Sequence, residues 1–455
     1  MMIDRRFHIV ALALTAAFMV FVDGTIVNLA LAQLAARLGA SRSELEWAIN
    51  AYTLSFAAVM LVAGAITDAL GARRTFLCGL SVFTAASAIC ASATTMPVLD
   101  IARLVQGAGS ALLLPSALVL ATASTADEAA HQKMLGWWAA AGGLGMAAGP
   151  LLGGVLVEVA DWRAVFAVNV IVGIPALLWS IRSLPEPAAR GSQRLDLVGM
   201  GCATALIGGL VFALVQAPAQ GRLSPAVLTA TALALLGLTG FVLAARGSRA
   251  PLLPPATYRD RGFATANVQG ALFNFAFQGL LFAMSLMLQE GRGLGALVSG
   301  LMFLPLTGLI PVGSICAVPL ARRLGRSTAL AVGQVSLAIT LLAVAWAGTS
   351  DSLWPLASAL VPAGFSAGLL VPIMTSRALG AVRPALHGSA SAVFNTSRQI
   401  GAAVGVAVFG PLLGSTGSVG TGFAVCVTVG AAATAVALLL TGLDRFAKVS
   451  RPVAG

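Results

Sequence analysis

Residues 9–31 read IVALALTAAFMVFVDGTIVNLAL, and this stretch decides what kind of fold the chain can adopt. A helix needs ~20 predominantly apolar residues to cross the ~30 Å hydrocarbon core of a bilayer, and this run is long enough. A spanning segment must satisfy its own backbone hydrogen bonds, and the alternating pattern of a membrane barrel is missing, so we expect a transmembrane α-helix. Basic residues precede the run, as in a signal peptide. It contains Asp23, however, and no small-residue cleavage site clearly follows, so we expect it to be retained.

Similar apolar blocks recur along the whole chain, which is 58% apolar and only 9% charged. Soluble globular domains are usually ~45–50% apolar and ~25% charged, and a chain with so few charges could not cover a surface exposed to water. The blocks predict an all-α membrane protein with 14 transmembrane helices, arranged six, two and six. The predicted spans are 9–31, 45–67, 75–94, 97–122, 134–157, 163–182, 197–217, 225–245, 263–288, 297–320, 328–347, 353–375, 390–413 and 421–442.

The connections and two internal echoes predict the domain organisation. The longest polar and Pro-rich connection reads RGSRAPLLPPATYRDRG over residues 246–262. Residues 149–153 and 410–414 both read GPLLG, and Gly107 and Pro115 have the same spacing as Gly364 and Pro372. Both echoes fall at matching positions of the two groups of six helices, which indicates two homologous halves. We therefore expect an N-terminal six-helix half at 1–190, an inserted two-helix pair at 191–250 and a C-terminal six-helix half at 251–455.

The distribution of basic residues predicts the orientation in the membrane. With the N-terminus inside, the cytoplasmic segments hold twenty of the 27 Lys and Arg residues and the outer loops hold five. Short loops rich in Lys and Arg stay on the cytoplasmic side, so we expect a multi-pass protein of the inner (plasma) membrane with both termini in the cytoplasm. The net charge of +11 is spread over many segments, so this bias accounts for it and we expect no nucleic-acid partner.

Four motifs of the first half support a family resemblance. Residues 23–30 read DGTIVNLA, residues 64–74 read GAITDALGARR, Arg103 is followed by Gln106, Gly107 and Gly109, and residues 136–154 read GWWAAAGGLGMAAGPLLGG. Over nearly the whole chain the sequence resembles the major facilitator superfamily, and specifically its fourteen-helix drug:proton antiporter branch. The loop at 322–326 resembles the gating motif of the second half, with three arginines and no acidic residue.

The resemblance implies the major facilitator fold, with two pseudo-symmetric six-helix halves around a central cavity. It also implies a proton-coupled efflux transporter that exports small hydrophobic or amphiphilic compounds by alternating access. A dedicated metabolite exporter or a proton-symport importer of the same fold is the alternative. The expected partners are a small-molecule substrate, protons and the lipid bilayer, and we expect a monomer.

Asp23 and Arg103 are the candidate proton-coupling residues. An intramembrane carboxylate is costly and usually faces the bundle interior or a water-filled path. Burial raises a carboxyl pKa and a nearby cation lowers it, so a change of access or partner could switch Asp23 between its two protonation states. Both residues lie in the outer halves of their spans, so a direct or water-mediated pair is possible. The alternative is a static ion pair that only orients helices.

Two further motifs have a mechanical interpretation. The candidate antiporter motif lets helices approach closely, although ordinary small-residue packing would need the same glycines. The candidate gating motif would form a cytoplasmic latch, although a solvated loop is the alternative. The antiporter motif comprises Gly136, Gly145, Gly149, Pro150, Gly153 and Gly154, and the gating motif comprises Gly64, Asp68, Gly71, Arg73 and Arg74.

Polar residues within the spans are candidates for lining the substrate cavity, with interhelical hydrogen bonding as the alternative role. They are Asn28, Gln106, Asn274, Gln278, Asn395 and Arg398. One buried acid against two buried basic residues argues against multivalent cations, and neutral, monocationic and anionic amphiphiles remain open.

Other classes of function lack the residues that they need. His8, His131 and His387 are isolated, no span contains paired carboxylates, and no Cys/His ligand spacing occurs. We therefore expect no enzyme activity, no metal site and no cofactor, with the proton gradient as the energy source. The five cysteines all fall in spans without close pairing, so no disulfide framework is expected.

Overall fold

The computed structural model describes residues 2–125, 127–184, 196–221, 223–247, 257, 260–383 and 387–449. Within these residues, thirteen helical segments are long and apolar enough to cross a membrane, and the prediction of an all-α membrane protein is confirmed. The predicted span at 390–413 lies in a further helix, α16 (His387–Gly414), of 28 residues. Its first half contains Ser, Asn, Thr, Arg and Gln side chains, which lower its mean hydropathy below that of the other spans.

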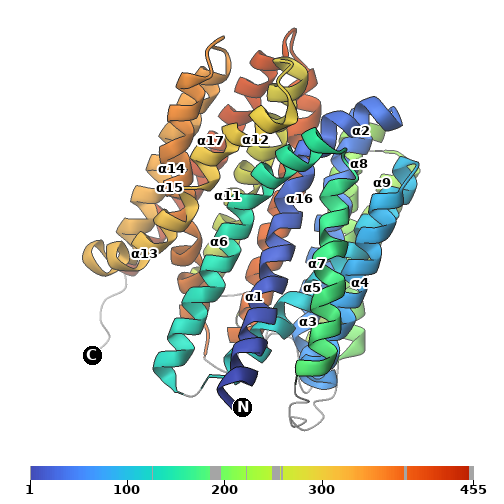
Figure 1. The fold of residues 1–455 in the computed structure, drawn as a ribbon. Helices are drawn as coiled ribbons and strands as arrows, with labels where there is room; N and C mark the ends of the chain where they lie inside the picture. Colours follow the sequence, from blue (N-terminus) through green and yellow to red (C-terminus); the bar gives the residue numbers. More distant parts are fainter. Residues whose placement is uncertain are drawn as a thin grey trace. The chain divides into compact units, whose positions relative to one another are not determined.

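From α1 to α7 the helices follow one another with short connections (Figure 1). Gly71 alone joins α3 to α4, with a φ of 88° that favours glycine. The elements are α1 (Met2–Ile26), the 3-10 turn η1 (Val27–Ala30), α2 (Leu31–Leu38), α3 (Arg42–Leu70), α4 (Ala72–Ser92), α5 (Met96–Ala123), α6 (Glu128–Val159), α7 (Ala164–Ser183), α8 (Leu197–Gln220) and α9 (Pro225–Gly247).

The later helices include two irregular regions. A π-helical turn ends α11, and a break with prolines on both sides, Pro305 and Pro311, separates α12 from α13. The elements are α11 (Arg261–Leu286), the π-helical turn η2 (Met287–Gly291), α12 (Ala296–Thr307), α13 (Ile310–Leu324), α14 (Arg326–Gly348), α15 (Trp354–Gly380), α16 (His387–Gly414) and α17 (Val419–Val449).

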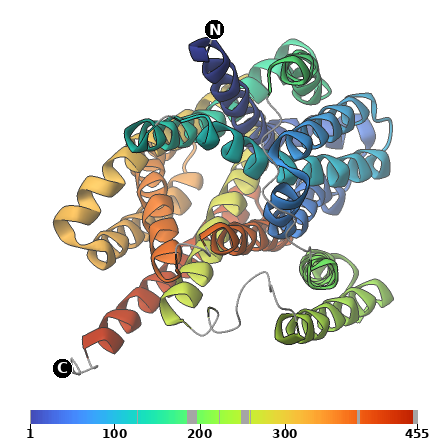
Figure 2. The same cartoon turned by 90° about the horizontal axis from the view of Figure 1, so that it is seen from below.

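The chain divides into two compact units. The first comprises Met1–Leu252 and Gly293–Leu301, and the second comprises Leu253–Arg292 and Met302–Gly455. Helices α8 and α9 lie side by side (Figure 2), and α8 packs on α3, where Trp47 Nε1 donates to Gln216 Oε1 at 2.9 Å. The expected boundaries at 190/191 and 250/251 lie outside the described residues, so the three-part division remains a prediction.

In each unit, a glycine lets the fourth spanning helix pack closely against the second spanning helix. A Cβ atom added at Gly107 of α5 would meet the Tyr52 carbonyl of α3, and one added at Gly364 of α15 would lie 2.7 Å from the Leu306 carbonyl carbon of α12. Only glycine allows backbones to approach this closely. The sequence echo between Gly107 and Gly364 therefore corresponds to the same kind of contact inside each unit.

Candidate functional site

The carboxylate of Asp23 is the centre of a buried polar network in the first unit. Asp23 lies in α1, near the 3-10 turn η1, and is 0% exposed. Its Oδ2 accepts a hydrogen bond from Arg103 Nη1 at 2.6 Å, and its Oδ1 accepts from Gln106 Nε2 at 2.9 Å and from Asn169 Nδ2 at 2.7 Å. The donors come from α5 and α7, so three helices share one negative charge.

The guanidinium of Arg103 is held on several sides. Arg103 is 1% exposed, and its Nε donates to the Ala48 carbonyl of α3 at 3.0 Å. Its Cζ lies 4.3 Å from the centroid of the Tyr52 ring and 5.7 Å from that of Phe166. Aromatic faces attract a desolvated cation, so these rings stabilise the charge along with Asp23.

Gln106 extends the network to a fifth helix. Its Oε1 accepts from Arg103 Nη1 at 2.6 Å, and its Nε2 donates to Ser87 Oγ of α4 at 2.8 Å as well as to Asp23. One α-helical turn separates Arg103 from Gln106, which places both side chains on the same face of α5. One more turn along α5, Ser110 Oγ accepts from the Tyr52 hydroxyl of α3 at 3.0 Å. Five spanning helices therefore converge on one acid and one base.

This arrangement corrects and extends the prediction from sequence. Asp23 and Arg103 form a direct ion pair, but Gln106, expected to line a substrate cavity, is a member of their network and is 0% exposed. Asn169 and Ser87 were not among the predicted site residues. An amide within the apolar helix α7, in its second turn, was the available signal for Asn169. Asn28, in η1, donates from Nδ2 to the Thr25 carbonyl of its own chain segment at 3.0 Å.

The candidate antiporter motif lies in α6, beside α1 (Figure 1). Cβ atoms added at Gly145, Gly149 and Gly153 would lie 2.9, 3.0 and 2.8 Å from carbonyl oxygens of α1, so these three glycines form the contact between the two helices. Gly154 faces the start of α12, in the segment that groups with the first unit, where an added Cβ would lie 2.7 Å from the Ala296 carbonyl. Pro150 is inside α6, and nothing lies within 4 Å of a Cβ added at Gly136.

The candidate gating motif does not form an internal ion pair. Asp68, near the end of α3, is exposed and makes no salt bridge or hydrogen bond with a described residue. Arg73 Nη2 instead donates to the Ile181 carbonyl at the end of α7 at 3.2 Å. Arg74 is exposed. Gly71 supplies the turn between the helices, and a Cβ added at Gly64 would have open space around it. The structure thus shows how the turn is built, and the latch remains a prediction.

The second unit brings together two of the predicted cavity residues. Arg398 of α16 donates from Nε to Asn274 Oδ1 of α11 at 3.3 Å. Asn395, one turn before Arg398, donates from Nδ2 to the Ser391 carbonyl at 3.0 Å. Gln278 is part-buried in α11 and has no hydrogen bond with a described residue. These side chains come from the two helices that form the most extensive contact of the unit.

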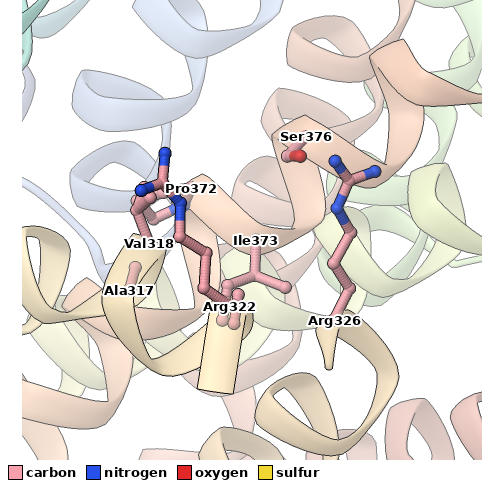
Figure 3. A pocket seen from close by; sticks show the side chains of 8 residues that line it. Ala317, Val318, Arg322, Arg326, Pro372, Ile373 and Ser376 are labelled. Carbon is pink, nitrogen blue, oxygen red and sulfur yellow. The ribbon is translucent and has the colours of Figure 1, made fainter. Parts of the chain in front are cut away.

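Other basic residues lie at one end of the second unit. Arg377 of α15 forms an ion pair with Asp444 of α17, and its Nη2 also donates to Thr265 Oγ1 of α11 at 3.2 Å. A cavity of about 330 Å³ lies between α13, α14 and α15, and Arg322 and Arg326 flank it without a carboxylate partner among the described residues (Figure 3). The sequence did not single out this cavity.

The ion pair at Asp23 predicts a measurable coupling between its members. Replacing Asp23→Asn leaves the Arg103 charge buried without its counter-charge, which costs about 3–5 kcal/mol in soluble proteins. We expect a large decrease in thermal stability of the detergent-solubilised protein. The double variant Asp23→Asn/Arg103→Gln should recover part of the loss, because it removes both charges.

Asp161→Asn is the matched control, because Asp161 forms an exposed ion pair with Arg163 at 3.6 Å. The measurement is the midpoint of thermal unfolding followed by size-exclusion chromatography. Equal midpoints for Asp23→Asn and Asp161→Asn would contradict the importance of the buried pair.

Comparison with known proteins supports both the helical membrane fold and a transport function. The chain matches the Major Facilitator Superfamily over residues 13–406. It is 36% identical to the methylenomycin A resistance protein of Bacillus subtilis, and the alignment covers 93% of this chain and 91% of that protein. It is 37% identical to the cephamycin export protein CmcT of Amycolatopsis lactamdurans, and that alignment covers 90% of this chain and 84% of that protein. The crystal structure of a POT family transporter in complex with a thioalcohol-conjugated peptide aligns with a TM-score of 0.71 at 16% identity, covering 97% of this chain and 96% of that one. The chain is therefore a multi-pass membrane transporter that belongs to the Major Facilitator Superfamily.

Proposed function

We propose that this chain is a proton-coupled efflux transporter, a drug:proton antiporter that exports small hydrophobic or amphiphilic compounds by alternating access. The observation that carries the proposal is the fully buried Asp23 carboxylate, held by Arg103, Gln106 and Asn169. Protonation of Asp23 would remove the negative charge that three donors now share. A single proton would thus change the interactions of α1 with both α5 and α7.

The location of Asp23 connects this chemistry to helix movement. The 3-10 turn η1 begins four residues after Asp23, and a 3-10 stretch within a helix often marks a hinge. The glycines of α6 also contact α1, and they leave no side chain of α6 between the backbones of α1 and α6, so the two helices can slide past each other. A change in the Asp23 network could therefore be passed to α6 as a small shift of α1.

The names of similar proteins support export rather than import. The methylenomycin A resistance and cephamycin export proteins are joined by the multidrug resistance protein Stp of Mycobacterium tuberculosis, 31% identical over 87% of this chain. A transporter confers resistance to a compound by moving it out of the cell, which is the same direction as export. A dedicated metabolite exporter is the second candidate, and the name of the cephamycin export protein favours it. The Lys and Arg distribution supports an inner-membrane location with both termini in the cytoplasm.

The proton-coupling test uses purified protein in vesicles with an imposed pH gradient. We expect several hydrophobic dyes and antibiotics to drive proton movement through the wild type, and Asp23→Asn to abolish that response while Asp161→Asn retains it. The double variant Asp23→Asn/Arg103→Gln provides a second measurement if the single variant does not fold. Full substrate-driven proton movement in either variant would remove Asp23 from the proton path.

The mechanical role of the antiporter motif has a matched pair of glycines within one helix. Gly149→Leu would place a side chain against Thr25 and the Val22 carbonyl of α1, whereas Gly136→Leu enters open space. We expect Gly149→Leu to reduce efflux at least tenfold and Gly136→Leu to stay near wild type, with both proteins present in the membrane. Cellular accumulation of a fluorescent substrate measures the difference, and equal accumulation by both variants would contradict a role for the α1–α6 contact.

A further inference from the structure

Arg398 in the second unit has a charge that no carboxylate of a described residue balances. In the first unit, the buried base Arg103 is compensated by Asp23. The second unit contains four acidic residues, and all lie at or near helix ends. They are Asp260, Glu290, Asp351 and Asp444.

Helix geometry places these acids far from Arg398. The partner of Arg398, Asn274, lies near the middle of α11, whereas Asp260 precedes that helix and Glu290 follows it. With a rise of ~1.5 Å per residue, each acid is on the order of 20 Å from Asn274 along the helix axis. Asp444 is already paired with Arg377, and Asp351 lies in the connection between α14 and α15. Among the described residues, none provides a salt bridge to Arg398.

Most of the hydrogen-bonding capacity of Arg398 is also unused. Its Nε donates to Asn274 Oδ1 at 3.3 Å, but neither Nη group donates to a described residue. The amide nitrogen of Asn274 and the amide of Gln278 likewise have no hydrogen bond with a described residue. Guanidinium and amide N–H groups of this kind match the oxygens of a carboxylate.

The packing of α11 on α16 holds the arginine in place. A Cβ added at Gly270 of α11 would lie 3.0 Å from Arg398 Cγ, so the stem of the arginine passes over this glycine. Cβ atoms added at Gly401 and Gly405 of α16 would lie 2.7 and 3.0 Å from Cα atoms of α11. The centroid of the Phe394 ring lies 6.0 Å from the guanidinium carbon of Arg398. A fixed cation beside amides and the Phe394 ring suits a ligand with one anionic and one apolar part.

We propose that Arg398, with Asn274 and Gln278, binds the negative charge of an anionic amphiphilic substrate such as a carboxylate. This inference rests on the proposed efflux function and specifies its substrate class. An uncompensated charge inside a membrane protein is costly, and an anionic ligand offsets that cost while a cationic ligand adds to it. The same charge therefore selects for anions and against cations.

Equilibrium binding to the detergent-solubilised protein tests the proposal without requiring proton movement. The probes are a cephalosporin carboxylate, its neutral methyl ester and the cation tetraphenylphosphonium. We expect the wild type to bind the carboxylate about ten- to a hundredfold more tightly than the ester, which is the range for hydrogen bonds to charged groups. Arg398→Gln should remove this preference, and Arg398→Lys should restore it in part.

Arg322→Gln is the matched control, because Arg322 is also without a carboxylate partner but lies at the cavity between α13 and α15. It should bind all three probes as the wild type does. Equal binding of carboxylate and ester by the wild type, an unchanged preference in Arg398→Gln, or a loss confined to Arg322→Gln would each overturn the proposal. A charge preference that depends on Arg398, found together with no substrate-driven proton movement, would keep the anion site and remove proton coupling.

Discussion

The ion pair between Asp23 and Arg103 is the interaction on which the first unit depends. An acid and a base 2.6 Å apart inside an apolar helix bundle need further hydrogen-bond partners around them. Gln106, Asn169, Ser87 and the Ala48 carbonyl supply those partners from four helices. The pair therefore fixes the relative positions of α1, α3, α4, α5 and α7, and any change in its charge would be felt by all five.

Close backbone contacts through glycine are the second constraint, and they appear in both units. In lipid, apolar side chains gain little by leaving their solvent, so helices associate by close packing. Gly145, Gly149 and Gly153 bring α6 against α1, and Gly401 and Gly405 bring α16 against α11. Each unit thus joins its first spanning helix to its fifth in the same manner. Asp23 lies on the first helix of the first unit, and Arg398 lies on the fifth helix of the second unit, where it donates to Asn274 of the first helix.

The two units differ in how they treat charge. The first compensates its buried base internally, whereas Arg398 in the second hydrogen-bonds a neutral amide and has no ion pair with a residue that the structure describes. Under the proposed function, this division separates the two tasks of a proton-coupled transporter. A closed acid–base network can respond to protons, and an open cation can respond to the charge of a ligand. Other charged groups of the second unit lie near helix ends, where charges are less costly. Among them are the Arg377–Asp444 ion pair and the two arginines at the cavity, Arg322 and Arg326.

The sequence by itself determined the fold class, the positions of the spans, and the pairing of Asp23 with Arg103 as a possibility. These follow from composition, from block length and from the rarity of charges in apolar helices, which are all local properties. Tertiary structure alone decided the partners. Gln106 was expected to line a cavity, but it hydrogen-bonds Asp23. Gly414 repeats Gly153 in the sequence, but a Cβ added at Gly414 has no atom within 4 Å, whereas one added at Gly153 would meet α1. In the same way, only the tertiary structure shows that Asn169 donates to Asp23 and that Asp68 forms no ion pair with a described residue. Which face of a helix meets which neighbour depends on rotation and tilt, and a sequence of uniformly apolar helices does not specify either.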